Sequence, residues 1–219
     1  DVAVVNTCGF LQEAREEALA EIQKLVEQKQ AGQLQKILVT GCMAQWWRDQ
    51  LAQRCPQADG FVGVSGYENL PQVIDQALRG EHPALFGDID APIPETDRVV
   101  CTSDYWAWLR IAEGCDNRCA YCIIPYARGR VRSRKPEDVE AEVKGLVARG
   151  YKEVVLTGIH LSSYGMEHRE GGPVQGGNWD HGPLLDLIER IHRIPGLERI
   201  RLGSLEPRII TEEFAGALA

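Results

Sequence analysis

The chain has 219 residues, of which 44% are hydrophobic and 26% charged, a composition typical of globular proteins and sufficient for one large domain or two modest ones. Its formal net charge of −8 argues against a protein that coats nucleic acid without specificity. No apolar run approaches the length of a membrane span and no signal-peptide pattern opens the chain, so we expect no membrane partner.

The first ninety residues alternate between strand-like and helix-like patterns. Short apolar runs rich in β-branched residues predict buried strands, and apolar residues spaced three and four apart predict helices. This alternation predicts an α/β fold with a parallel, doubly wound sheet, in which ligands bind beyond the carboxyl ends of the strands. The predicted strands are Val2–Val5, Ile37–Thr40 and Phe61–Val64, and the predicted helices are 11–32, 43–54 and 70–80.

Two cysteines, Cys8 and Cys42, follow the first two predicted strands in matching phrases, Val-Asn-Thr-Cys-Gly and Val-Thr-Gly-Cys-Met. The carboxyl ends of parallel strands lie at one edge of a sheet, so loops there can bring the two thiols together. The alternative is two small residues that are simply buried, since cysteine outside disulfides is often buried. Cys55 and Cys101 lie in no comparable phrase, and we expect no role for them.

A connector and a second set of elements follow. Residues 82–104 contain prolines and acids without periodicity, which predicts a linker. The strands and helices beyond it, with polar loops after the strands, predict a TIM-type β/α barrel or part of one. The stretch Gly165–Gly182 holds six glycines and predicts a mobile excursion. The predicted strands are 106–112, Glu153–Thr157 and Arg199–Leu202, and the predicted helices are 136–150 and Leu184–His192.

Three cysteines, Cys115, Cys119 and Cys122, have the spacing C-x3-C-x2-C in the loop after the strand at 106–112. Soft metals and iron–sulfur clusters prefer thiolate ligands. A structural zinc site normally has a fourth protein ligand, but the next histidine is His160, so the loop indicates an open site. The alternative is a non-catalytic iron–sulfur or zinc module. The chain has seven cysteines, an odd number, and three of them lie in this one loop, which favours metal-bound thiols in a reducing cytoplasm over a disulfide framework.

A local basic stretch accompanies this loop in an otherwise acidic chain. It can contact phosphate groups, or it can form a solvated basic face that has no partner. Its six cations are Arg118, Arg128, Arg130, Arg132, Arg134 and Lys135.

The three-cysteine loop resembles the signature of the radical S-adenosylmethionine enzymes. The continuation Cys122-Ile-Ile-Pro-Tyr-Ala-Arg-Gly129 is similar to the methylthiotransferases of that superfamily, as are Asn6-Thr-Cys8-Gly and Gly41-Cys42-Met-Ala-Gln45. The resemblance covers nearly the whole chain. It implies a methylthiotransferase amino-terminal domain at 1–90, a linker at 91–104 and a radical S-adenosylmethionine domain at 105–219. We expect both domains to be truncated, the first at its start and the second at its end.

The resemblance also implies cofactors. Cys115, Cys119 and Cys122 would hold a [4Fe–4S] cluster that binds S-adenosyl-L-methionine, which is cleaved to a 5′-deoxyadenosyl radical. Cys8 and Cys42 would ligate a second, auxiliary [4Fe–4S] cluster, incomplete here because the family's first cysteine lies further upstream. An electron donor such as a flavodoxin or ferredoxin would be a partner. The resemblance assigns no catalytic side chain. It places Tyr121 beside the cofactor, and the alternative is a tyrosine that is simply packed. Thr157, Gly158, Ser204 and Glu206 are further candidates for the cofactor pocket, because they follow predicted barrel strands.

Two subgroups of this family differ in substrate. The segments 155–165 and 201–207 resemble the subgroup that modifies C2 of N6-threonylcarbamoyladenosine at position 37 of tRNA. The segment 6–10 and the helix after it resemble the subgroup that methylthiolates an aspartate of ribosomal protein S12, which usually carries Gln-Asp where this chain has Ile159-His160. Because the reacting atom must approach the radical in the barrel, we expect the tRNA anticodon stem-loop as partner, with ribosomal protein S12 as the alternative. A base in a single-stranded loop is the least costly to extrude. His160 is either a contact to substrate or cofactor or a polar loop residue with no role.

Overall fold

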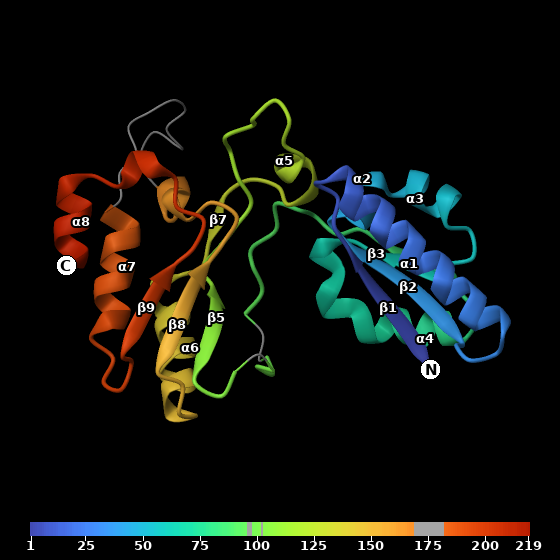
Figure 1. Ribbon diagram of the computed structural model, residues 1–219, viewed down its shortest axis with the longest axis horizontal. Helices are drawn as coiled ribbons and strands as arrows, with labels where there is room; N and C mark the ends of the chain where they lie inside the picture. The colour runs from blue at the N-terminus through green and yellow to red at the C-terminus, as the bar shows by residue number, and fades with distance from the viewer. Residues whose placement is uncertain (96–97, 102, 169–181) are drawn as a thin grey trace. The chain divides into compact units, whose positions relative to one another are not determined.

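The computed structural model describes residues 1–95, 98–101, 103–168 and 182–219 (Figure 1). The chain forms two compact units, one of Asp1–Ala91 with Arg118–Gly129 and the other of Pro92–Asn117 with Arg130–Ala219. The domain limits at 90, 104 and 105 stay a prediction. Most of the glycine-rich stretch predicted to be mobile lies outside the described residues. Within the described residues, no helix is both long and apolar enough to cross a membrane.

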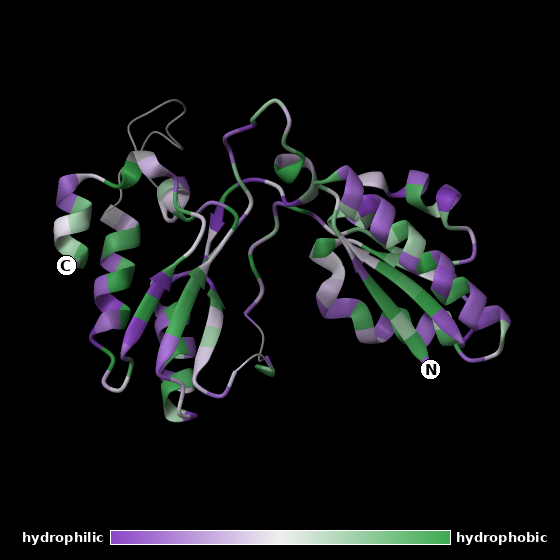
Figure 2. Ribbon diagram, viewed as in Figure 1, coloured by the Kyte–Doolittle hydropathy of each residue, from purple (hydrophilic) through white to green (hydrophobic). Residues whose placement is uncertain are grey.

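The first unit contains a four-stranded parallel sheet with the strand order β1-β2-β3-β4 (Figure 1). The α1 helix packs on one face through Ile37 and Val39 of β2, and the α4 helix packs on the other face through Leu38. Both faces of the sheet are therefore covered, as buried parallel strands require (Figure 2). The elements are β1 Val2–Thr7, α1 Gln12–Gln30, β2 Lys36–Gly41, α2 Cys42–Trp47, α3 Asp49–Arg54, β3 Gly60–Val62, η1 Val64–Asn69, α4 Leu70–Leu78, β4 Ala84–Leu85 and, after the unit boundary, α5 Ile124–Ala127.

Two predictions for this unit are wrong in detail. The single helix predicted at 43–54 is two short helices, because Arg48 between them has a φ of 44°, in the left-handed region that ends a helix. The predicted linker at 82–104 contains the strand β4, whose Ala84 and Leu85 pair in parallel with β3. The helix α5 was not predicted.

The second unit contains a three-stranded parallel sheet with the order β5-β8-β9 and a two-stranded antiparallel pair, β6 and β7. The core lies between the three-stranded sheet and helices α6 and α7, with Leu109, Leu156, Val143 and Leu187 at its centre. The helix α6 starts with a proline and two acids, which suit a helix amino terminus. The elements are β5 Trp106–Arg110, β6 Ala112–Glu113, β7 Arg132–Ser133, α6 Pro136–Ala148, β8 Glu153–Thr157, η2 Leu161–Ser163, η3 Met166–His168, α7 Gly182–His192, β9 Arg199–Leu202, η4 Pro207–Ile209 and α8 Glu212–Leu218.

The predicted strand at 106–112 is divided between two sheets. Its first part, β5, pairs with β8, whereas Ala112 belongs to β6, which pairs with β7. Ile111 makes the junction, since its N–H donates to the Thr157 carbonyl and its own carbonyl accepts from the Arg134 N–H. The strands predicted at Glu153–Thr157 and Arg199–Leu202 form as expected. The predicted α/β class with parallel sheets is confirmed.

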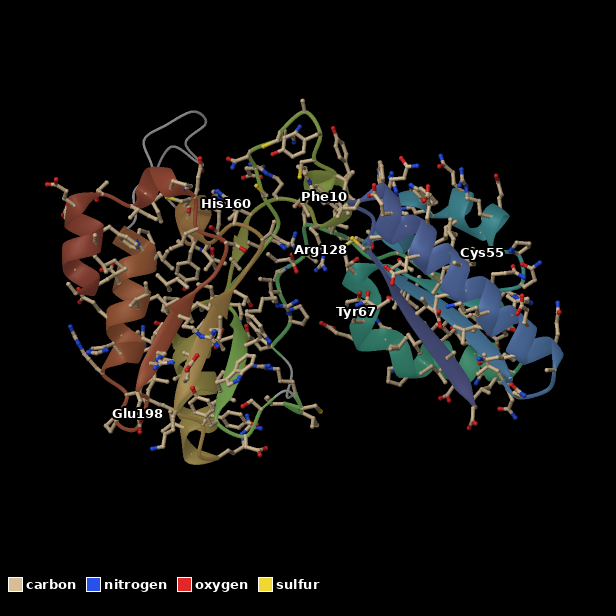
Figure 3. All side chains as sticks on the ribbon, viewed as in Figure 1. Phe10, Cys55, Tyr67, Arg128, His160 and Glu198 are labelled. Atoms are coloured by element: carbon tan, nitrogen blue, oxygen red, sulfur yellow. The ribbon has the colours of Figure 1, made fainter. Side chains whose placement is uncertain are left out.

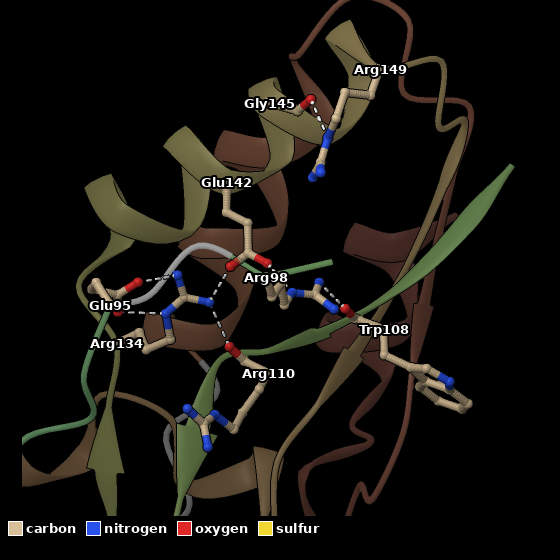
Figure 4. A network of polar contacts seen from close by, with 8 residues as sticks. All are labelled: Glu95, Arg98, Trp108, Arg110, Arg134, Glu142, Gly145 and Arg149. Carbon is tan, nitrogen blue, oxygen red and sulfur yellow. Dashed lines mark hydrogen bonds and ion pairs between the residues drawn. The ribbon is translucent and has the colours of Figure 1, made fainter. Parts of the chain in front are cut away.

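A buried arginine joins three parts of the second unit (Figure 4). The Arg134 side chain lies between Glu95, to which its Nε donates at 2.6 Å, and Glu142 of α6, to which its Nη1 donates at 2.6 Å. The same Nη1 donates to the Arg110 carbonyl at 2.8 Å. Burial alone would lower the pKa of Arg134, but the hydrogen bonds to the two carboxylates outweigh it and raise the pKa. Arg134 is therefore a structural cation.

Candidate functional site

The edge of the first sheet carries Cys8 and Cys42. Residues Thr7 of β1 and Gly41 of β2 are paired in the parallel register, so each cysteine comes directly after one member of that pair. A Cβ at Gly41 would lie 2.4 Å from the Thr7 carbonyl oxygen, and the residue has a φ of 102°. A glycine is therefore required for the close approach of the strand ends beside the two thiols.

The exposure of the cysteines separates candidate ligands from an inert thiol. Cys8 is exposed and Cys42 is half-buried, whereas Cys55 is buried. Burial raises the pKa of the Cys55 thiol, with a smaller opposing effect of Arg54, so this thiol stays protonated. All seven cysteines lie within the described residues and carry reduced thiols, not disulfides.

The three-cysteine loop crosses from one unit to the other after Asn117. Cys115 is half-buried in the second unit; in the first unit, Cys119 is exposed and Cys122 is half-buried. The Cys122 N–H donates to the Cys119 carbonyl at 2.9 Å, so these two residues form a turn. Tyr121 between them is 79% exposed, and its ring is accessible.

The polar candidates of the second unit lie at one edge of its sheet. Thr157 and Gly158 follow β8, and Ser204 and Glu206 follow the neighbouring strand β9, whose Leu202 pairs with Leu156. The Leu161 N–H donates to the Ser204 carbonyl at 3.3 Å, which joins the two loops. A Cβ at Gly158 would lie 3.1 Å from the Ala112 carbonyl oxygen, so the first loop passes close to β6. The structure therefore brings these four predicted residues to the same edge.

His160 connects this edge through hydrogen bonds that the sequence did not indicate. Its Nδ1 lies 2.6 Å from Ser163 Oγ, and its Nε2 lies 3.2 Å from Glu206 Oε2 and 3.4 Å from Asn117 Nδ2. The Glu206 N–H also donates to Ser162 Oγ at 2.8 Å. The imidazole is thus held in one orientation by groups from three segments.

The cations of the basic stretch do not all face solvent. Arg134 is 8% exposed and paired with two glutamates, and Arg130 pairs with Asp116 at 3.4 Å. The Nε of Arg128, a residue labelled in Figure 3, donates to the Cys42 sulfur at 3.1 Å, a contact within the first unit. These arginines therefore differ in environment, and Arg134 is unavailable to a phosphate.

The donor set fits soft-metal chemistry. Four of the five candidate thiols lie in loops, and the fifth, that of Cys42, begins α2 at the sheet edge. Thiolates are the preferred ligands of iron–sulfur clusters. Across the described ranges, no group of three His, Cys, Asp or Glu side chains lies close enough to hold a metal ion. The assignments of Cys115, Cys119 and Cys122 to one cluster, and of Cys8 and Cys42 to another, thus stay predictions.

Comparison with known families agrees with the two sets of motifs. Residues 109–218 match the family described as the Radical SAM superfamily, and residues 1–63 match the family described as Uncharacterized protein family UPF0004. The first match covers half of the chain and includes all three loop cysteines.

Named relatives match over the entire chain. A protein of Desulforamulus reducens called ribosomal protein uS12 methylthiotransferase RimO is 36% identical over 221 residues, covering 100% of this chain and 48% of the relative. The protein of that name from Moorella thermoacetica is 37% identical, with the same coverage of 100% and 48%. The chain thus spans about half the length of these relatives. A solved structure of the radical S-adenosylmethionine methyltransferase TsrM from Kitasatospora setae has a TM-score of 0.55 at 13% identity, over 97% of this chain and 51% of that one, which supports the fold.

Proposed function

We propose, from the premise that this chain belongs to the radical SAM superfamily, that the protein is a methylthiotransferase that uses [4Fe–4S] clusters and S-adenosyl-L-methionine. The observation that carries the proposal is the C-x3-C-x2-C loop following the first strands of a parallel β/α unit. When bound, the cluster and S-adenosyl-L-methionine would together supply a radical able to attack an unactivated C–H bond.

The residues of this chain would bind and orient these groups. Cys115, Cys119 and Cys122 would hold the first cluster, and Cys8 and Cys42 would contribute ligands to the auxiliary cluster. Thr157, Gly158, Ser204 and Glu206 would form part of the S-adenosyl-L-methionine pocket, because ligands of such sheets bind beyond the carboxyl ends of the strands. Tyr121 would cover the cofactor from the loop. His160, fixed by Ser163 and Glu206, would present a rigid polar group at the same edge.

The substrate we propose is ribosomal protein uS12, the alternative in the sequence analysis. Two observations support it over tRNA: the matched relatives are named for uS12, and Arg134 of the basic stretch is buried in ion pairs. The tRNA substrate that we expected from the barrel motifs is not supported by these relatives. A flavodoxin- or ferredoxin-type electron donor and a cytoplasmic location, where thiols stay reduced, complete the proposal.

Anaerobic reconstitution with iron and sulfide tests the cofactor assignment. The wild-type protein is expected to turn brown and to cleave S-adenosyl-L-methionine to 5′-deoxyadenosine after reduction. Cys119→Ala should lose the cleavage, while the control Cys101→Ala, at an exposed cysteine outside the motifs, should retain it. A colourless protein that binds zinc and yields no 5′-deoxyadenosine would refute the proposal.

The substrate is tested in cells that lack the gene. Intact-mass analysis of uS12 should show loss of the methylthio group, and restoring the wild-type gene should return it. Unchanged uS12 together with loss of the 2-methylthio group from N6-threonylcarbamoyladenosine in tRNA would reject uS12 in favour of tRNA.

A further inference from the structure

A hydrogen bond connects the two cysteine motifs within the first unit. The Nε of Arg128, at the carboxyl end of α5, donates to the sulfur of Cys42 at 3.1 Å. Arg128 follows the three-cysteine loop in the chain, whereas Cys42 begins α2 at the edge of the sheet. The protein therefore directs a guanidinium group at one candidate cluster ligand from the segment that carries two others.

Close packing around this contact makes its geometry well defined. Ile123 is buried, and its Cδ1 lies 2.9 Å from the place where a Cβ at Gly9 would be. The same Cβ would lie 3.1 Å from the Met43 nitrogen and 3.2 Å from the Cys42 carbonyl carbon. The chain after Cys8, the start of α2 and the segment before α5 are thus closely packed at Gly9.

The backbone of α5 adds a second constraint on Arg128. The backbone N–H of Arg128 donates to the Ile124 carbonyl at 2.7 Å, and the preceding residue, Ala127, is fully buried. The base of the arginine side chain is consequently held on the same short helix that Ile123 anchors to Gly9. An arginine whose backbone is already fixed loses less conformational entropy when its planar guanidinium makes a hydrogen bond.

The chemical nature of the acceptor indicates what the contact is for. The sulfur of a thiol is a weak acceptor, whereas the sulfur of a metal-bound thiolate carries negative charge and accepts a charge-assisted hydrogen bond. Hydrogen bonds to ligand sulfurs are among the factors that set the reduction potential of an iron–sulfur cluster. A guanidinium also adds positive charge, which favours the more negative, reduced state.

We propose that Arg128 is a positioning residue for the auxiliary cluster, donating to the Cys42 sulfur and raising the reduction potential of the cluster that this sulfur ligates. The inference rests on the proposed function, since it takes Cys42 as an iron ligand. In this role Arg128 acts through the Cys42 sulfur, which it orients.

The test uses full-length protein in which Cys115, Cys119 and Cys122 are replaced by alanine, so that only the auxiliary cluster forms. Arg128→Gln is compared with Arg128→Lys and with the control Arg130→Gln, whose side chain contacts Asp116. Arg128→Gln should shift the midpoint potential to more negative values and speed iron loss to a chelator about 10-fold, at the low end for outer-shell ligand partners. Arg128→Lys, which keeps the charge, should restore part of the potential, and the control should match the parent.

A second measurement separates positioning from simple packing. Hydrogen exchange at the amides of Ala127 and Arg128 in the metal-free protein reports how well α5 is held. Faster exchange in Arg128→Gln with an unchanged midpoint potential would overturn the inference, because it would assign Arg128 to packing alone. Failure of the parent to form any auxiliary cluster would instead overturn the assignment of Cys42 as a ligand, and this inference with it.

Discussion

The Arg134 network provides a direct test of how the second unit is held together (Figure 4). Replacing Arg134 by methionine keeps the length and apolar stem of the side chain but removes its hydrogen bonds to Glu95, Glu142 and the Arg110 carbonyl. Glu142 would keep its 2.7 Å ion pair with Arg98, while Glu95 and the Arg110 carbonyl would lose this partner.

The expected cost follows from the burial of the partners. Removing one member of a fully buried ion pair costs about 3–5 kcal/mol. Here the Arg134 side chain is 7% exposed but Glu95 is 40% and Glu142 22% exposed, so water can solvate part of each carboxylate. We therefore expect a loss of about 2–4 kcal/mol, less than the fully buried case. At about 3 °C per kcal/mol for a chain of this size, Tm should fall by roughly 10 °C.

Urea unfolding followed by circular dichroism measures this loss, with Arg149→Met as the matched control. Arg149 is an exposed arginine at the carboxyl-terminal cap of α6, and its Nε donates to the Gly145 carbonyl at 3.3 Å (Figure 4). Its replacement should cost less than about 1 kcal/mol, as surface substitutions usually do. Equal losses in the two variants would refute the view that burial makes the Arg134 network stabilising.

Substitutions at Gly41, with Gly80 as a control, and at Asp59 test the first unit. Gly41→Ala should lower the free energy of unfolding in urea by more than about 2 kcal/mol, because the added Cβ would meet backbone atoms. Gly80 also has a positive φ, of 85°, but has open space around it, so Gly80→Ala should cost about 1 kcal/mol. Similar losses in the two variants would contradict the steric argument. Asp59 is buried, which by itself raises its pKa, but hydrogen bonds from Lys29, the Ile37 N–H and Lys36 outweigh this and lower the pKa. Because the folded-state pKa lies below the unfolded value of about 3.9, the stabilisation is complete above that value and is lost as pH falls through the folded pKa. The destabilisation by Asp59→Asn should therefore be largest at neutral pH and shrink in acid, and a pH-independent loss would contradict this account.

The sequence predicted the elements whose patterns are long and regular. Strands such as Glu153–Thr157 and helices such as Leu184–His192 carry enough apolar residues for their period to be recognised. The two-residue strands Ala84–Leu85 and Arg132–Ser133 carry no period at all, since pairing with a neighbouring strand defines them. The break at Arg48 was equally invisible, because a non-glycine residue in the left-handed region has no sequence signal.

The candidate site was predictable where a motif gathers its residues in one short segment. The loop cysteines and the phrases around Cys8 and Cys42 are of this kind. The contacts between His160 and Glu206 and between Arg128 and Cys42 span 46 and 86 residues along the chain, and they exist only after folding. The basic stretch shows that residues adjacent in sequence need not share an environment in the fold. Its cations are adjacent in sequence, yet burial places Arg134 in the core of an ion-pair network.

One topological rule locates the candidate residues in both units. In the first unit Cys8 and Cys42 follow the paired ends of β1 and β2, and in the second unit the Thr157 and Ser204 loops follow the paired strands β8 and β9. Parallel pairing makes neighbouring strands end at the same edge, so residues distant in sequence meet without any motif that links them. The two edges differ in the chemistry of their side chains. Thiols at the first edge suit iron, and hydroxyl, carboxylate and imidazole groups at the second suit a polar cofactor or substrate. The position of each edge follows from topology, whereas what it can bind follows from the few residues after each strand.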